Sequence, residues 1–431
     1  MKKTSFSIFH LTEDQAITLL STPPEQLEEP ADRYIAASRL VEYPSARTVQ
    51  ALIQAVNQPG DDLNNRIVRR KSVETLGHLR AATALPDIRS CLKDDDCYTV
   101  ENAVWAIGKI AGEKDDPDHI SLDGAILEEV ADVLERPNQS YRVIIQTLGK
   151  LGYKAAAERI RPWMQADDLM VASAAIATLY CFGDHNAAMD RVVDMLQDTN
   201  VNVRRSCLQD LIDTNYYAAI PKIVQCPISM VFRLRAIEAL ALAGIKDSVI
   251  TFAGDVEPYL DQVINDHPDT IELVHEYDQT PAIEFAVNEL YETDFGRCYL
   301  ATKTLLEVYP QESPIALMAA YEDKAHHDYG GYYHVMRLFG WLNYGPAFKL
   351  LVKALHNQEP QFKKARVAGA IALGKLGNPY AIDELQLAWD TATWELQYAI
   401  LMALEKLGGL SQSTLQSEHP LVRAKWSSLK G

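Results

Sequence analysis

Two stretches of the sequence place aromatic and charged side chains on one helical face. Tyr98, Glu101 and Trp105 have the spacing of such a face, because residues three and four apart are neighbours on a helix. Aromatic rings pack on a flat conjugated ligand, and a carboxylate accepts hydrogen bonds from ring N–H groups. This face therefore fits a groove for a flat ligand whose own acid groups pair with Arg and Lys. The second stretch repeats the spacing with Tyr329, Tyr332 and Met336.

The same faces also have a purely structural explanation. Aromatic side chains at the joints between helical units are often partly packed, while their charged neighbours are solvated. The spacing alone favours this explanation, and the groove remains the alternative.

The run from His326 to Arg337 concentrates three His, three Tyr, an Asp and an Arg at one expected helix start. Adjacent helical residues point about 100° apart, and no second His or acidic cluster lies at a matching distance, so we predict no metal site. His327 and Asp328 form no nucleophilic triad, because the sequence holds no G-x-S-x-G segment. Gly330 and Gly331 alone do not make a phosphate loop.

The six cysteines are scattered, with no C-x-x-C pair and no His at zinc spacing. The pattern therefore predicts neither a disulfide framework nor a zinc site. We expect most of these thiols to be buried, since a free Cys behaves as a small hydrophobic residue.

Helices in a repeat must position these faces. Between Leu40 and Leu404, twelve apolar anchors span eleven intervals with a mean near 33 residues, the length of a short helix pair. Apolar residues recur at helical spacing around the anchors, and alternating strand patterns are almost absent, so the fold is predicted to be all-α. The anchors are Leu40, Leu76, Ile107, Leu148, Leu179, Leu211, Leu240, Leu273, Leu305, Leu338, Leu373 and Leu404.

We predict an α-solenoid of about a dozen HEAT-like helix-pair repeats, because one helix pair cannot bury its apolar stripe whereas a stack can. Residues 1–30 are expected to form an N-terminal cap, and residues 31–431 a single continuous solenoid whose anchor helices line the concave side. Leu273 is the weakest anchor, since the small residues that surround the others are missing there.

An arginine stands seven residues before the anchor in five of the twelve units. A residue that recurs at one register is explained most simply as a ladder that bonds the turn Asp or Asn of a neighbouring unit. These five are Arg33, Arg69, Arg204, Arg233 and Arg366.

The net charge excludes one class of function. The chain has 41 Lys and Arg against 59 Asp and Glu, and its net charge of −18 opposes the phosphate neutralisation that nucleic-acid binding requires. No apolar run approaches the roughly 18 residues of a membrane span. The start, Met1–His10, has the basic end of a secretion signal, but Thr12, Glu13 and Asp14 interrupt its apolar region. We expect a cytoplasmic protein.

Three segments carry a resemblance to a known family: residues 65–77, 98–108 and 326–341. They resemble the signatures of the E/F-type phycobilin lyases of cyanobacteria and red algae, most closely the branch that acts on the phycoerythrin α subunit. The resemblance extends over most of the chain. It implies an enzyme that attaches a linear tetrapyrrole, phycoerythrobilin, through a thioether to a cysteine of an apo-phycobiliprotein.

The resemblance also implies roles for particular residues. Arg66, Arg70 and Lys71 would pair with the propionates, and Glu101 would face the pyrrole N–H groups. The other expected residues of the binding site are Tyr98, Asn102, Trp105, Tyr332, Tyr333 and Arg337. His334 or Asp328 would accept the proton of the client thiol. The bilin is a substrate here, and we expect no permanent cofactor.

Three alternatives stay open. A lyase-isomerase would also convert the bilin to phycourobilin, although the NHCQGN string that resembles one isomerising subgroup is absent. A second E/F-type subunit could assist the reaction. A non-enzymatic HEAT scaffold could use the same Tyr and Arg residues to dock another protein.

Overall fold

The protein is built from helices. The computed structural model describes residues 11–60, 62–112, 117–184, 188–410 and 415–430, and in these ranges it contains α-helices and short 3-10 helices but no strand. The prediction of an all-α fold of stacked helix pairs is confirmed. Met1–His10 lies outside the described residues, so the expectation about its start is not addressed.

The chain divides into two compact units, residues 1–189 and 190–431, which are called unit 1 and unit 2 below. The predicted continuity of one solenoid from residue 31 onward stays a prediction. In the segment expected to form the cap, α1 (Glu13–Ser21) begins with a capping box in which Thr12 and Gln15 bond each other's backbone N–H groups. It packs on α2 (Asp32–Arg39) and on α3 (Ala46–Val56).

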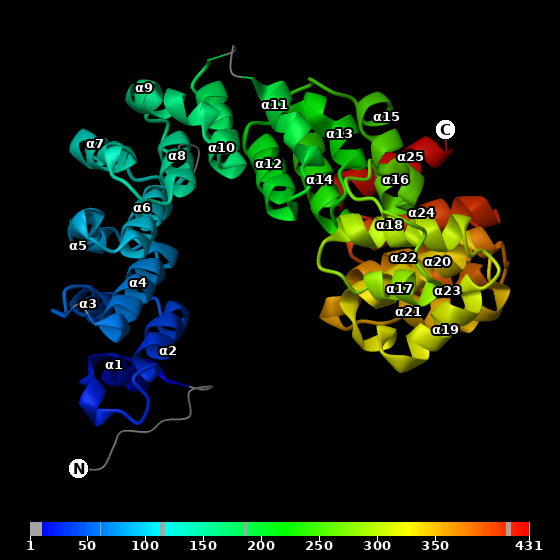
Figure 1. Cartoon of the computed structure of the whole chain (residues 1–431), viewed down its shortest axis with the longest axis horizontal. Coiled ribbons are helices and arrows are strands. Elements are labelled where there is room, and N and C mark those ends of the chain that lie inside the picture. Colours follow the sequence, from blue (N-terminus) through cyan, green and yellow to red (C-terminus); the bar gives the residue numbers. More distant parts are fainter. Residues whose placement is uncertain (1–10, 61, 113–116, 185–187, 411–414, 431) are drawn as a thin grey trace. The chain divides into compact units, whose positions relative to one another are not determined.

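Unit 1 has two rows of helices. The anchor helices stack in order in one row, and a second set of helices covers its other side (Figure 1). The first row contains α2, α4 (Leu63–His78), α6 (Cys97–Ala111), α8 (Tyr141–Lys150) and α10 (Leu169–Cys181). The second row contains α3, α5 (Leu85–Ser90), α7 (Gly124–Asp132) and α9 (Ala157–Ile160).

Small residues bring the anchor helices of unit 1 close together. A methyl group on Gly77 would come within 2.9 Å of the Cα of Ala106, and one on Gly108 within 3.0 Å of the Thr147 side chain. Any larger side chain at these glycines would push the helices apart. The Leu-Gly signal of the repeat therefore marks the points where α4 meets α6 and where α6 meets α8.

The anchors test the predicted repeat. Ten of the twelve lie inside α-helices and are fully buried, and Leu40 is buried just after the last residue of α2. The predicted helix around Leu273 is wrong, because residues 272–282 form no helix between η10 (Pro268–Thr270) and α17 (Ile283–Glu289). Pro268 cannot donate an N–H to a helix, and Asp266 before it adopts a left-handed backbone that ends α16 (Glu257–Asn265).

The predicted arginine ladder is confirmed in part, because Arg366 bonds Thr391 rather than an Asp or Asn, and the carboxylate partner of Arg204 lies 90 residues away. Each of the five guanidinium groups bonds the backbone or turn of its own or a neighbouring unit. Arg69 donates to Asp94 at 3.0 Å, and Arg366 donates to the carbonyl oxygen of Thr391 at 2.9 Å. The remaining pairs are Arg33 with Asn65, Arg204 with Asp294 and Arg233 with Asp266. Apart from Arg204, these arginines join consecutive repeats, and four of the five are buried.

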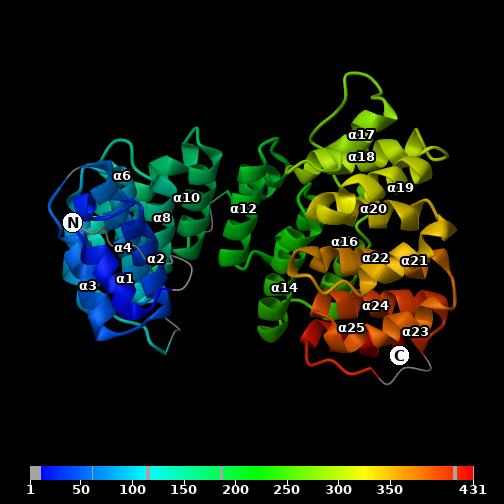
Figure 2. The same cartoon turned by 90° about the horizontal axis from the view of Figure 1, so that it is seen from below.

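Unit 2 stacks its anchor helices around an extra helix. Figure 2 shows α18 (Phe295–Glu307), α20 (Tyr329–Trp341), α22 (Lys363–Leu376) and α24 (Trp394–Leu407) in succession. The helix α16 packs against α22 and α24, and also against α13 (Ile220–Gln225) and α14 (Met230–Lys246). Asp261 of α16 accepts hydrogen bonds from Tyr398 at 2.8 Å and from Lys425 at 2.7 Å. The inner face of these repeats is therefore occupied by the protein itself.

Lys364 is expected to make the stability of unit 2 depend on pH. Its side chain is buried, with the ammonium 4.2 Å from the ring centroid of Phe295 and 4.3 Å from that of Tyr329. Burial lowers the pKa of Lys364 from 10.5 to about 7, although the ring faces favour the cation. Between pH 7 and 10 the unfolded chain holds a proton that the folded chain releases, so stability from this group rises with pH.

We therefore expect Lys364→Met to remove part of the pH dependence of unfolding. Wild-type stability should gain about 1–3 kcal/mol from this group between pH 7 and pH 9, at up to about 1.4 kcal/mol per pH unit. The variant should lack that gain and be the more stable protein at pH 7. Urea unfolding at several pH values measures the difference. If the free energy of unfolding changed with pH in the same way in both proteins, Lys364 could not be a neutral amine buried in the folded state.

Candidate functional site

A cavity of about 780 Å³ opens beside the first turns of α6 and α8. Its other wall comes from η7 (Arg161–Gln165) and from the start of α10. The lining residues are Glu101, Gln139, Ser140, Tyr141, Arg142, Val143, Pro162, Trp163, Ala166, Asp167, Asp168 and Val171.

A second cavity of about 660 Å³ lies along the C-terminal halves of α4, α6 and α8. Its lining residues are Gly77, His78, Arg80, Trp105, Gly108, Lys109, Gly112, Val143, Gln146, Thr147 and Lys150. Val143 lines both cavities, so they adjoin each other along α6 and α8. The two adjoining cavities together are called the α6–α8 groove below.

One end of the α6–α8 groove is acidic and aromatic. The hydroxyl of Ser140 donates to Oε2 of Glu101 at 2.6 Å, which fixes the carboxylate at the wall. The rings of Tyr141 and Trp163 lie against each other, with centroids 3.9 Å apart and planes tilted by 30°. Asp167 adds an exposed carboxylate to this acidic end. Rings and carboxylates together can hold a flat ligand that donates N–H groups.

The other end of the groove is basic. Arg80, Lys109 and Lys150 line it, and its described lining contains no Asp or Glu. The ammonium of Lys109 lies 5.6 Å from the ring centroid of Trp105, and His78 meets the same ring edge-on at 4.8 Å. In a chain with a net charge of −18, a cavity wall with three cations and no carboxylate is suited to an anionic ligand.

The predicted propionate ligands do not line this groove. Arg70 donates to both carboxylate oxygens of Asp96, at 2.6 and 2.5 Å, and lies 4.7 Å from the Tyr98 ring centroid. Lys71 pairs with Glu74 at 2.6 Å. The structure therefore neutralises these two cations within the protein. Arg66 lies on the same helix, α4, and also outside the groove.

The predicted residues of α6 separate into two groups. Glu101 and Trp105 line the groove, one in each of its two parts. Tyr98 is 57% exposed and lies outside it. Asn102, also outside it, donates its side-chain N–H to the Tyr98 carbonyl oxygen at 2.9 Å. Glu101 and Trp105 are therefore the two predicted residues that the structure brings together in a ligand-sized space.

The predicted residues of α20 are buried, which corrects the expectation that they wall an open pocket. Tyr332, Tyr333 and Arg337 each have at most 1% of their surface exposed. Tyr333 donates to Asp266, and Arg337 donates to the Ile264 carbonyl oxygen at 2.6 Å. The C-terminal end of α16 covers Tyr333 and Arg337, whereas Tyr332 packs against the Phe362 ring of the following helix pair.

His334 and Asp328 do not offer a base to an incoming thiol in this arrangement. His334 is 1% exposed, and burial lowers its pKa well below the usual value, so the ring is neutral. Asp328 caps α20 and accepts backbone N–H bonds from Gly330 at 2.8 Å and Gly331 at 2.6 Å. Both residues have structural environments that the sequence spacing alone does not reveal.

Three of the residues that form the basic end of the groove share a position in the repeat, although none of them is among the predicted site residues. Two residues after the anchor stand His78, Lys109 and Lys150, in three consecutive units. All three line the same cavity. Tyr141 and Trp163 follow no such register, and only the packing of η7 against α10 brings that pair to the groove.

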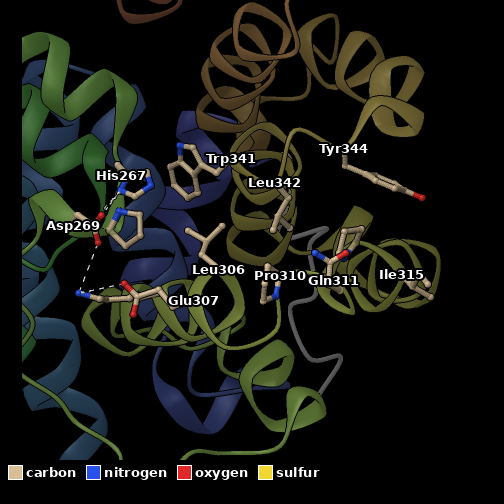
Figure 3. A pocket seen from close by; sticks show the side chains of 13 residues that line it. His267, Asp269, Leu306, Glu307, Pro310, Gln311, Ile315, Trp341, Leu342 and Tyr344 are labelled. Atoms are coloured by element: carbon tan, nitrogen blue, oxygen red, sulfur yellow. Dashed lines mark hydrogen bonds and ion pairs between the residues drawn. The ribbon is translucent and has the colours of Figure 1, made fainter.

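Unit 2 has a cavity of about 760 Å³ of its own (Figure 3). The rings of His267 and Trp341 meet edge-on there at 5.1 Å. Its one lysine, Lys303, lies 3.7 Å from both Asp269 and Glu307, so its charge is balanced within the protein. This cavity therefore lacks the separation of acidic and basic ends that marks the α6–α8 groove.

The thiols of the protein are poor nucleophiles where their pKa is shifted. Burial raises the pKa of Cys91 to about 11 and that of Cys226 and Cys298 to about 12. As expected, four of the six cysteines are buried. The described residues contain no group of three or more His, Cys, Asp or Glu able to hold a metal ion. None of the described helices has the length and apolar character needed to cross a bilayer.

These features define a HEAT-repeat protein with a ligand-sized groove whose two ends carry opposite charge. Comparison with known proteins agrees with the repeat, since the model of HEAT repeats matches residues 61–135. The chain is 50% identical to the uncharacterized phycocyanin operon protein Y of Pseudanabaena tenuis, over 99% of this chain and 100% of that protein.

Two further relatives carry names that refer to bilins. The bilin biosynthesis protein CpeY of a Synechococcus strain is 30% identical, over 88% of this chain and 90% of that protein. The phycocyanobilin lyase subunit alpha of a Nostoc strain is 29% identical, over 48% of this chain and 78% of that protein. The chain therefore belongs to the E/F-type family of HEAT-repeat bilin lyases, and it is an enzyme of the lyase class.

Proposed function

We propose that this protein attaches phycoerythrobilin to a cysteine of an apo-phycoerythrin α subunit through a thioether bond. The observation that carries the proposal is the α6–α8 groove, which combines aromatic walls, a fixed carboxylate and a basic end in a member of the bilin lyase family. A linear tetrapyrrole offers matching groups: conjugated rings, pyrrole N–H groups and two propionates. Both the phycoerythrin client and this particular bilin are parts of the proposal.

In the proposed reaction the client supplies the nucleophile. Its cysteine sulfur bonds to the exocyclic ethylidene carbon of ring A, and the thiol proton ends on ring A, so the addition needs no oxidant or reductant. The lyase holds the bilin and orients it, which converts an encounter of two molecules into a positioned reaction. Glu101 accepts pyrrole N–H bonds and stabilises the protonated, electron-poor chromophore that a thiolate attacks.

Co-expression tests the proposal. This chain, an apo-phycoerythrin α subunit and the enzymes that make phycoerythrobilin are expected to give a client with acid-stable, zinc-fluorescent pigment. Omission of this chain should leave the client colourless. A client that stays colourless with the chain present, both alone and with a second E/F-type subunit, would refute the proposal.

The same experiment separates the alternatives. Parallel arms with an apo-phycocyanin α subunit and with phycocyanobilin test the client and the bilin, because two relatives are named after phycocyanin or phycocyanobilin. Pigment with the absorption of phycourobilin on the client would identify a lyase-isomerase. A stable complex with the client that never gains pigment would support the scaffold.

A further inference from the structure

The basic end of the α6–α8 groove is built from one repeated register. Lys109 and Lys150 each stand two residues after the anchor, in the last turns of the neighbouring helices α6 and α8. The two helices approach each other closely just before these lysines. A methyl group on Gly108 would lie only 3.0 Å from the side chain of Thr147. Two ammonium groups thus reach one cavity from adjacent helix ends.

Helix stability alone accounts for part of this pattern but not for its placement. A lysine in the last turn favours any helix, since it complements the negative end of the helix dipole. Lys375 and Lys406 occupy the same register in unit 2. Neither of these lines a cavity described above, whereas Lys109 and Lys150 share one with Trp105.

The charge balance of unit 1 also distinguishes these two lysines. Arg70 and Lys71 have carboxylate partners at 2.5 and 2.6 Å. Over the part of the chain that the structure describes, no carboxylate pairs with Lys109 or Lys150, and the ammonium of Lys109 lies over the Trp105 ring, 5.6 Å from its centroid. A dicarboxylate ligand would therefore meet two cations without breaking an ion pair of the protein.

We propose that Lys109 and Lys150 bind the two carboxylates of the ligand, a flat conjugated dicarboxylate, and so set its position in the α6–α8 groove. The assignment rests on the proposed function and deepens it, because it moves the propionate site from α4 to the ends of α6 and α8. Trp105 packs on the conjugated part beside the carboxylates. The remaining rings then extend past Val143 toward Glu101.

Binding of two probes tests the assignment. Biliverdin is a linear tetrapyrrole with two free propionates, and its dimethyl ester keeps the rings but loses both charges. We expect Lys109→Gln with Lys150→Gln to weaken biliverdin binding about tenfold to hundredfold and to leave binding of the ester unchanged. Absorbance titration of the full chain measures both. Added salt should weaken wild-type binding of biliverdin more than of the ester.

Lys93 and Lys154 supply the matched control. Both are exposed lysines of unit 1 outside the groove, so their double replacement by Gln removes the same charge and should not change either affinity. Equal biliverdin affinity in wild type and in Lys109→Gln with Lys150→Gln would overturn the assignment, as would an equal loss for the ester. Wild type that binds neither probe would overturn it together with the proposed function. If biliverdin binding depended on the two lysines but co-expression gave no pigment on the client, only the proposed function would be refuted.

Discussion

Replacement of Asp266 by Asn is expected to lower the free energy of unfolding of the protein by about 3–5 kcal/mol. Asp266 is fully buried in unit 2 and forms an ion pair with Arg233, which is buried as well. Tyr299 donates to its carboxylate oxygens at 3.0 Å, and Tyr333 donates to it too. The change removes the carboxylate that pairs with Arg233 and leaves its buried guanidinium without this counter-ion.

The size of this effect follows from burial. An exposed ion pair contributes at most about 1 kcal/mol, because water and salt screen it. A buried cation that loses its partner keeps the full cost of desolvation. Asn also tolerates the left-handed backbone at this position, where φ is 50°, so strain does not add to the result.

Asp269 supplies the control for Asp266. It lies three residues later, its side chain is 60% exposed, and its ion pair with Lys303 spans 3.7 Å. Asp269→Asn should change the free energy of unfolding by less than about 1 kcal/mol. Urea unfolding followed by far-UV circular dichroism measures both variants. A loss of under 1 kcal/mol for Asp266→Asn would show that the buried ion pair is not what holds α16 in place.

The repeat was predictable because its signals are local. Leu76 and Ile107 are buried anchors, and the ladder arginine Arg69 bonds the following turn, because each needs only its own helix pair and the next one. The failure at Leu273 has a local cause as well. Pro268 interrupts the helix, and the spacing of the neighbouring anchors conceals the break.

The candidate site was predictable in part, for a different reason. Arg70 and Tyr332 stand at the same register, six residues before an anchor, yet Arg70 is partly exposed and Tyr332 is buried. Tyr332 packs at 5.1 Å from the Phe362 ring centroid, a contact with the following helix pair. Tyr333, the next residue, is covered by α16 through Asp266. No helical period encodes such contacts, since they depend on how the repeats of unit 2 close around one helix.

The position of a basic residue in the repeat also does not show whether a carboxylate of the protein pairs with it. Arg70 and Lys71 belong to a basic run, residues 66–71, to which the family resemblance assigns the propionates. The structure pairs both with nearby carboxylates, of Asp96 and Glu74. The cations that line a cavity without acids are more widely spaced in sequence, at Lys109 and Lys150. The density of like charge in a sequence therefore does not show which cations lack a carboxylate partner in the folded protein.

Glu101→Gln is expected to slow ligation by about a hundredfold while bilin binding changes less than about threefold. Glutamine has the shape of glutamate, and its carbonyl oxygen can still accept the hydrogen bond from Ser140 that holds Glu101 at 2.6 Å. The groove therefore keeps its form. What is lost is the negative charge that stabilises a protonated chromophore, and this charge matters most when the thiolate attacks.

Two readouts on one variant separate this role from simple binding. Bilin affinity comes from absorbance titration of the full chain, and the ligation rate from the appearance of acid-stable pigment on the client in a single turnover. Asp95→Asn is the control, because Asp95 is an exposed carboxylate in the turn before α6 that lies outside the groove. It should leave both values unchanged. Parallel losses of affinity and rate in Glu101→Gln would make Glu101 a binding residue, and an unchanged rate would remove it from the mechanism. A slower rate at constant affinity is expected only if the carboxylate acts on the chromophore during attack.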